Sequence, residues 1–142
     1  IRRSVQSGMP TVAECGGFLY LQKALKDTHG TLWPMVGTLP GTGYGTERLQ
    51  RFGYLTLSGE QDSLLLRAGE QVHANEFQHW ECTDCGSDLI AGKTGGRTWR
   101  CGFVGKRLYA AFPHIHWGGA LPMAERFVQA AAEYREERQH GA

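Results

Sequence analysis

Cys15 is the residue of this chain best placed to act as a nucleophile. It follows the apolar residues Val12 and Ala13 and precedes Gly16 and Gly17, in the stretch TVAECGGFLYLQKAL. A strand, a tight turn and a helix in this order are typical of a nucleophile elbow, here with sulfur in place of serine. The glycines allow a sharp turn, and the start of a helix favours the thiolate. The N–H of Gly16 is then well placed to donate to an oxyanion.

A catalytic cysteine needs a base, and His114 is the best candidate. It ends a predicted strand just before a Gly-Gly loop, where its side chain can reach a cleft at the edge of the sheet. Residues this far apart in sequence can be neighbours in the fold. His116 competes for the role, because strand alternation puts both imidazoles on one face. The alternative for Cys15 is a buried cysteine without chemistry, since free cysteines are among the most buried residues.

A second group of cysteines could bind a metal. Cys82 and Cys85 form a CxxC pair, and Cys101 lies further along the chain. A structural zinc site would need a fourth ligand, for which His79 and His73 are the candidates. Because Cys101 has no CxxC partner, the spacing matches only half of a zinc ribbon. We therefore expect reduced cysteines in a loop and no metal site.

The composition is that of one ordinary globular domain. The chain has 142 residues, 41% of them hydrophobic and 20% charged, and its formal net charge is +1. A charge so close to neutral gives no electrostatic case for binding nucleic acid or an anionic membrane. No apolar run approaches the roughly 18 residues of a membrane helix, and the first ten residues do not resemble a signal peptide. We expect a cytoplasmic protein with reduced thiols.

The elements that must position these residues alternate between helix and strand. A strand, a helix, several short strands and a last helix predict an α/β domain with three layers and an open mixed sheet. The glycine-rich segment 39–45 is predicted to be a loop, and Gly105 and Lys106 a two-residue turn between paired strands. Besides the strand before Cys15, we expect helices over 16–26 and 121–137, and strands over 33–37, 48–58, 71–81, 89–91, 98–104 and 107–112.

Several segments together resemble the glutaminase domain of cobyrinic acid a,c-diamide synthase, a class I-type glutamine amidotransferase of cobalamin biosynthesis. The matching segments are AECGGFLYL, VGTLPG, RFGY, NEF and FPHIHW, which follow the family's order through nearly the whole chain. The resemblance implies that Cys15 attacks the side-chain amide of glutamine, giving a thioester and ammonia. It also implies that His114 activates Cys15 and protonates the leaving ammonia, while the Gly16 N–H supplies part of the oxyanion hole.

The resemblance also implies which other residues surround the site. Other class I glutaminases carry a glutamate two residues after the histidine. Here that position is His116, as is common in this family, so we expect a Cys-His dyad. Glu76, in the NEF segment, is expected near the active cleft without an assigned role. Asn75 and Gln78 stand where the family has the two histidines of HEFH.

The family's synthase also carries an N-terminal ATP-dependent domain that activates corrinoid carboxylates. The resemblance therefore implies glutamine, a corrinoid and this synthase domain or subunit as partners, with ATP and Mg²⁺ used there and no cofactor in this chain. Residues 1–142 are expected to be a partial glutaminase domain that lacks its first elements and the synthase domain. The alternative is a catalytically inactive fragment that keeps the fold for packing or for binding a partner.

Overall fold

Strands make up most of the regular structure of residues 1–140, which the computed structural model describes. The helices are α1 (Arg2–Gln6), α2 (Gly16–Leu21) and α3 (Leu121–His140), and a 3-10 turn, η1 (Trp117–Gly119), precedes α3. The strands are β1 (Thr11–Glu14), β2 (Ala24–Lys26), β3 (Leu32–Pro34), β4 (Thr42–Gly45), β5 (Arg51–Gly59), β6 (Gln71–Gln78), β7 (Trp80–Cys82), β8 (Leu89–Gly92), β9 (Thr98–Cys101), β10 (Phe103–Gly105), β11 (Leu108–Ala111) and β12 (His114–Ile115).

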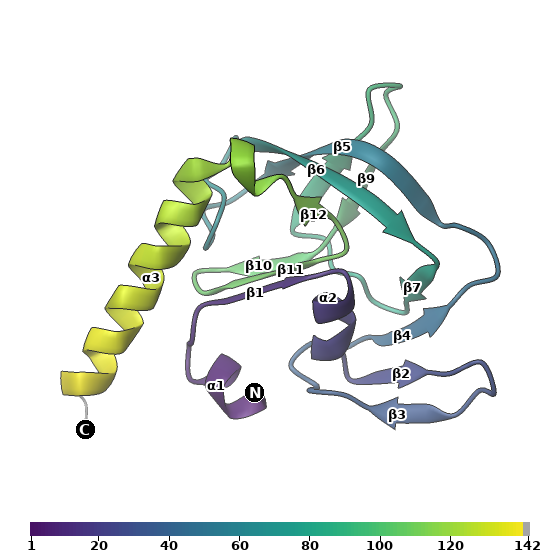
Figure 1. Ribbon diagram of the computed structural model, residues 1–142, viewed down its shortest axis with the longest axis horizontal. Helices are drawn as coiled ribbons and strands as arrows, with labels where there is room; N and C mark the ends of the chain where they lie inside the picture. The colour runs from purple at the N-terminus through teal and green to yellow at the C-terminus, as the bar shows by residue number, and fades with distance from the viewer. Residues whose placement is uncertain (141–142) are drawn as a thin grey trace.

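The strands of the described residues form three sheets. Their strand orders are β1-β11-β10, β12-β6-β5-β8-β9 and β3-β2-β4-β7. In Figure 1 the three-stranded sheet lies between the other two, and α3 runs along one side of the molecule. The pairs β1–β11 and β2–β4 are parallel, while the other pairs are antiparallel. The predicted α/β class with mixed pairing is confirmed, with more strand and less helix than expected.

The parallel pair β1–β11 positions the candidate catalytic residues. Thr11 lies opposite Leu108 and Glu14 opposite Ala111, so both strands end at the same edge of the sheet. Cys15 follows β1 directly, and His114 follows β11 after two further residues. In sheets of this kind, ligands bind outside the carboxyl ends of parallel strands. The topology therefore brings two segments almost a hundred residues apart to one edge.

Two apolar clusters hold the sheets together. One lies under β5, β8 and α3 and includes the fully buried Leu57, Leu65 and Tyr109. The other surrounds α2, where Phe18 packs edge-on against Phe112 with ring centroids 4.9 Å apart. Because Phe18 belongs to α2 and Phe112 follows β11, this contact fixes the helix after Cys15 against the strand that leads to His114.

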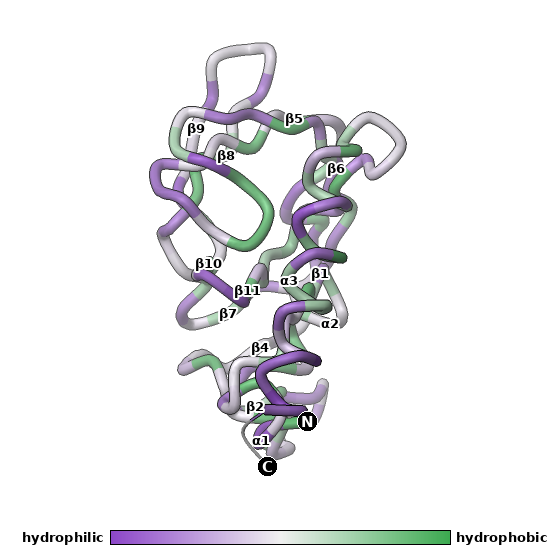
Figure 2. Tube along the Cα trace, turned by 90° about the vertical axis from the view of Figure 1, so that its left-hand side faces the viewer, coloured by the Kyte–Doolittle hydropathy of each residue, from purple (hydrophilic) through white to green (hydrophobic). Residues whose placement is uncertain are grey.

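The last helix is less buried than its sequence pattern suggested. At helical spacing one face carries Met123, Phe127, Val128, Ala131 and Tyr134, but Met123 is the buried residue of α3, and Val128 is exposed. Figure 2 shows the hydrophilic character of most of this helix. No helix within residues 1–140 has both the length and the apolar character required to cross a membrane.

The predicted helix over 16–26 ends five residues early. The backbone of Gln22 is extended (φ −63°, ψ 168°), and residues 24–26 form strand β2. The side-chain oxygen of Gln22 accepts a hydrogen bond from the N–H of Gly41 at 2.9 Å, which ties this turn to the segment before β4. Residues 42–45, expected as part of a loop, pair with β2 as strand β4. Strand pairing thus replaces the last helical turn.

Two long predicted strands are each divided between sheets. The segment 71–81 breaks at His79 into β6 and β7, and the segment 98–104 breaks at Gly102 into β9 and β10. Gly102 has φ +73°, a conformation that favours glycine, and its N–H donates to the carbonyl of Cys85 at 2.7 Å. The chain can therefore turn at Gly102 from the five-stranded sheet into the three-stranded sheet.

Candidate active site

Cys15 lies on a strained turn between β1 and α2. Its φ of 49° makes it the one residue other than glycine with positive φ among residues 1–140. Such a conformation costs about 1–3 kcal/mol and persists only where the surroundings hold it. Here the N–H of Cys15 donates to the carbonyl of Ala111 at 3.0 Å, and its carbonyl accepts from the N–H of Leu19 at 3.0 Å. The strand, sharp turn and helix expected around Cys15 are all present.

The surroundings of Cys15 favour the protonated thiol. Burial is the largest cause that raises the pKa of Cys15, and the charges of Glu14 and Glu76 raise it further. The N–H of Gly16, hydrogen-bonded to the sulfur, lowers the pKa but does not outweigh the burial. The pKa of Cys15 therefore moves in the opposite direction to the expectation that the helix start favours a thiolate, because burial of the sulfur outweighs the Gly16 N–H. Cys15 needs a base to react.

His114 lies beside the residue that precedes Cys15. The Nδ1 of His114 is 3.6 Å from the Oε2 of Glu14, and the Oε1 of Glu14 accepts a hydrogen bond from the N–H of Ile115 at 3.0 Å. The side chain of His114 is 47% exposed, so solvent and small molecules can reach it. Glu14 thus joins the end of β1 to β12 and brings the nucleophile elbow and the histidine to one place.

Glu14 is the residue of this arrangement that the sequence interpretation missed. A signal for it was available, since Glu14 is the last residue of β1 and is adjacent to the candidate nucleophile. Its contact with His114, however, depends on how β1 pairs with β11, and these two strands are almost a hundred residues apart in sequence. Sequence spacing alone gave no reason to pair the two residues.

His116 lies apart from this contact. Strand β12 ends at Ile115, so strand alternation does not extend to His116, which precedes η1. The N–H of His116 donates to the carbonyl of His73 at 2.9 Å. A cavity of about 490 Å³ lies beside these residues, lined by Tyr54, His73, Ala74, Asn75, Ile115 and His116.

Glu76 is placed in the interior under β6. It is 2% exposed, and neither of its carboxylate oxygens has a hydrogen-bond partner. Burial is the largest cause that raises the pKa of Glu76, opposed by the charges of Arg51 and Lys93. Asn75, the neighbour of Glu76 on β6, pairs with His114 and belongs to the exposed face of the strand. Since successive residues of a strand face opposite sides, Glu76 belongs to the face away from His114.

The cysteines of the CxxC pair are joined in a disulfide. Cys82 and Cys85 have Cα atoms 5.5 Å apart and form this bond, so the expectation of reduced cysteines is wrong. The carboxylate of Glu81 lies near both sulfurs. Cys101 is buried in the other apolar cluster, and burial raises its pKa to about 12. The three cysteines therefore do not come together as the alternative zinc site would require.

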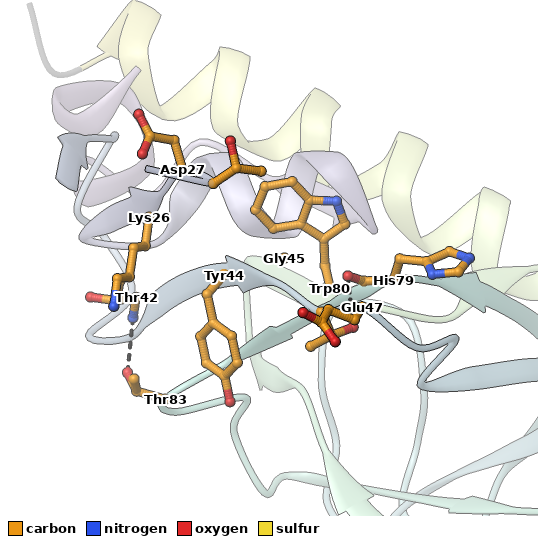
Figure 3. Close-up of a pocket in the computed structure, with 11 residues that line it drawn as sticks. Lys26, Asp27, Thr42, Tyr44, Gly45, Glu47, His79, Trp80 and Thr83 are labelled. Carbon is orange, nitrogen blue, oxygen red and sulfur yellow. Dashed lines mark hydrogen bonds between the residues drawn. The ribbon is translucent and has the colours of Figure 1, made fainter. Parts of the chain in front are cut away.

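A larger cavity, of about 830 Å³, lies on the four-stranded sheet. Figure 3 shows Tyr44, Trp80 and His79 lining it from β4, β7 and the residue between β6 and β7. One wall is closed by a hydrogen bond from the N–H of Thr42 to the hydroxyl of Thr83, 2.9 Å long. Cys15 and His114 do not line this cavity, so it is separate from the candidate active site.

Comparison with known proteins relates the chain to glutamine amidotransferases. Residues 1–121 match the family described as CobB/CobQ-like glutamine amidotransferase domain. The chain is 34% identical over 137 residues to the cobyrinate a,c-diamide synthase of Caldanaerobacter subterraneus subsp. tengcongensis, which covers 94% of this chain and 30% of that protein. It is 35% identical over 127 residues to the cobyrinate a,c-diamide synthase of Fusobacterium nucleatum subsp. nucleatum, covering 88% and 28%.

A protein with a related name is similar to the same degree. The hydrogenobyrinate a,c-diamide synthase of Thermobifida fusca is 34% identical over 136 residues, a match that covers 92% of this chain and 27% of that protein. The chain therefore spans less than a third of the length of these curated relatives.

Proposed function

The chain belongs to the CobB/CobQ-like glutamine amidotransferase domain family, and from this premise we propose that it hydrolyses glutamine with Cys15 as the nucleophile and His114 as the base. The observation that carries the proposal is the edge where β1 and β11 end together. There Cys15 occupies a strained elbow, and Glu14 holds the segment that bears His114. The thiol of Cys15 is half-buried and its pKa is raised, so it needs a base, and the exposed imidazole of His114 at the same edge of the sheet is the base we propose.

The proposed reaction has two stages. His114 takes the proton of Cys15, and the sulfur attacks the side-chain carbonyl carbon of glutamine. The N–H of Gly16 donates to the oxyanion, and as the intermediate collapses His114 gives the proton to the leaving ammonia. Water, activated by His114, then hydrolyses the thioester to glutamate and regenerates the Cys15 thiol. In sum, one glutamine and one water give one glutamate and one ammonia.

We further propose that the ammonia serves to amidate a corrinoid carboxylate. This part of the proposal comes from the named relatives, which are diamide synthases of cobyrinate and hydrogenobyrinate. Since both names occur among proteins of similar identity, the proposal goes no further than the corrinoid class. ATP and Mg²⁺ would act in an attached or separate synthase domain, because the Gly-Lys-Thr of residues 92–94 has Ser87 where a phosphate loop has its first glycine, and it joins two strands instead of opening a helix.

Covalent labelling tests the glutaminase proposal. The protein is treated with a diazoketone analogue of glutamine, and modified residues are identified by mass spectrometry. We expect one adduct, on Cys15, that is lost in Cys15→Ala and strongly slowed in His114→Ala. Cys101→Ala is the matched control and leaves labelling unchanged, because the Cys101 thiol is buried and has a pKa of about 12. A folded protein that is not labelled on Cys15 would refute the proposal.

A binding role without catalysis is the second candidate. It is favoured by a cluster of exposed aromatic side chains on β5 and β6, formed by Phe52, Tyr54 and Phe77. Exposed apolar surface that gathers in one place often marks an interaction site. This candidate predicts a folded protein that reacts with no glutamine analogue, so the same labelling experiment separates the two functions.

A further inference from the structure

The carboxylate of Glu14 makes two contacts with the segment that carries His114. One oxygen accepts the backbone N–H of Ile115 at 3.0 Å, and the other faces the Nδ1 of His114 at 3.6 Å. The first contact fixes the backbone directly after His114. The second places a negative charge at one specific ring nitrogen. Among residues 1–140, Glu14 is the carboxylate that the structure pairs with His114.

A base for a thiol must present an unprotonated nitrogen to the sulfur. In a neutral imidazole one ring nitrogen carries the proton and the other accepts, and the partner of one nitrogen decides which. A carboxylate accepts hydrogen bonds and does not donate them. Glu14 therefore favours the form of His114 with the proton on Nδ1 and leaves Nε2 free to accept a proton.

From this geometry we propose that Glu14 is the positioning residue of the site, holding His114 in the Nδ1–H form and in a fixed place at the edge of the sheet where Cys15 follows β1. The inference rests on the proposed glutaminase function for its catalytic meaning. It assigns to the residue before the nucleophile the task that a carboxylate after the histidine performs elsewhere, since His116 occupies that position here. The imidazole of His116 cannot supply a carboxylate, and the backbone N–H of His116 donates a hydrogen bond to the carbonyl of His73.

The distance of 3.6 Å between Glu14 and His114 is longer than an ordinary hydrogen bond. Catalytic hydrogen bonds are often long in the resting enzyme and shorten when substrate is bound. The bond from Ile115 to Glu14 already holds the carboxylate next to the His114 backbone, so only the last few tenths of an ångström to the ring nitrogen remain to be closed.

If the charge of Glu14 acted only on Cys15, removing this carboxylate would make the thiol more reactive. The charge of Glu14 helps to raise the pKa of Cys15, after the larger effect of burial. Replacing Glu14 by glutamine would therefore increase the thiolate fraction of Cys15. If Glu14 acts through His114, however, the same replacement slows the reaction. The sign of the change separates a positioning role from an effect on the thiol.

The test measures labelling of Cys15 by the diazoketone analogue of glutamine in Glu14→Gln, with Glu125→Gln as the matched control. Glu125 is an exposed glutamate on α3 and takes no part in the site. We expect Glu14→Gln to slow labelling about 10- to 100-fold, a part of the roughly 100- to 10,000-fold that a general base supplies. Glu125→Gln is expected to react like the wild type.

The double variant decides whether Glu14 acts through His114. In a His114→Ala background, Glu14→Gln should not slow labelling further, because the histidine that it positions is gone. An equal slowing in both backgrounds would mean that Glu14 supports the elbow itself, and would overturn the inference. So would a Glu14→Gln protein that is labelled as fast as the wild type.

A spectroscopic measurement needs neither a variant nor activity. Nitrogen NMR of the wild-type protein, at a pH where His114 is neutral, reads which ring nitrogen carries the proton. The inference predicts the Nδ1–H form, and the Nε2–H form would overturn it. If wild-type Cys15 is not labelled at all, the proposed function fails, while this measurement still decides the role of Glu14. If labelling depends on His114 but not on Glu14, only the inference fails.

Discussion

The ion pair between Glu70 and Arg126 gives a prediction whose size follows from the structure. Both terminal nitrogens of the Arg126 guanidinium donate to the Glu70 carboxylate, at 2.5 and 2.6 Å, and Arg126 also donates to the carbonyl of Leu65 at 2.6 Å. These contacts attach α3 to the segment before β6. The hydrogen bonds from Arg126 are the main reason that the pKa of Glu70 falls from 4.5 to about 2. Replacing Glu70 by glutamine removes the charge and keeps the shape.

The expected loss of stability in Glu70→Gln follows from the pKa shift of Glu70. A shift from 4.5 to about 2 would correspond to about 3.4 kcal/mol at 1.36 kcal/mol per pKa unit. Glu70 is 36% exposed and Arg126 is 20% exposed, so water screens the pair. Exposed pairs contribute about 0–1 kcal/mol, and bidentate arginine pairs reach the upper end of that range. We therefore expect Glu70→Gln to lower the free energy of unfolding by about 1 kcal/mol near neutral pH.

The lowered pKa of Glu70 also fixes how the stability contributed by the pair changes with pH. A carboxylate whose pKa is lowered in the folded protein contributes stability above its unfolded pKa of 4.5. This stability is lost as the pH falls toward about 2. Urea unfolding near neutral pH should therefore separate wild type and Glu70→Gln, and at about pH 2 the two should converge. Glu125→Gln is the control on the same helix and should match the wild type throughout. If Glu70→Gln is as stable as the wild type near neutral pH, the pair does not stabilise the attachment of α3.

Two further substitutions test the backbone geometry described above. Cys15→Gly removes the nucleophile and also the strain of a positive φ. It should therefore abolish labelling while raising the free energy of unfolding by about 1 kcal/mol in urea titrations, and a loss of stability would contradict the strained elbow. Gly86→Ala should lower stability by about 2 kcal/mol or more, because a Cβ there would lie 2.1 Å from the carbonyl oxygen of Gly102 at a φ of +74°. Thermal unfolding measures this loss, and Gly95→Ala, with no atom near its Cβ position, is the matched control.

The nucleophile elbow could be predicted from sequence because its signals are local. An apolar strand, a cysteine and two glycines specify the turn within a few residues. The helix after it was predicted too long, because the residues from Gln22 to Leu25 are all strong helix formers. What overrides this preference is pairing with β4 and the hydrogen bond from Gly41 to Gln22, which lie outside any local window. The pairing of strands that are distant in sequence therefore could not be predicted from the sequence.

The site was predictable only in part for the same reason. Cys15 and His114 could be named from their motifs, and the ends of β1 and β11 bring their segments to one edge. Glu14 could not be paired with His114, because only the register between β1 and β11 puts them in contact. The alternation of β6 was visible in sequence, but which of its faces is buried depends on the sheets packed around it. This is why the buried position of Glu76 was not foreseen.

The place of β1 at the margin of its sheet has a consequence for regulation. In the part of the chain that the structure describes, β1 pairs with β11 on one side only. Its other side offers backbone donors and acceptors that a further strand could bind. A strand added there would lie next to Glu14, one residue from the sulfur, and would stiffen both the elbow and the carboxylate that contacts His114. A strand bound at this sheet edge would in that way affect the reactivity of Cys15 through the backbone of β1.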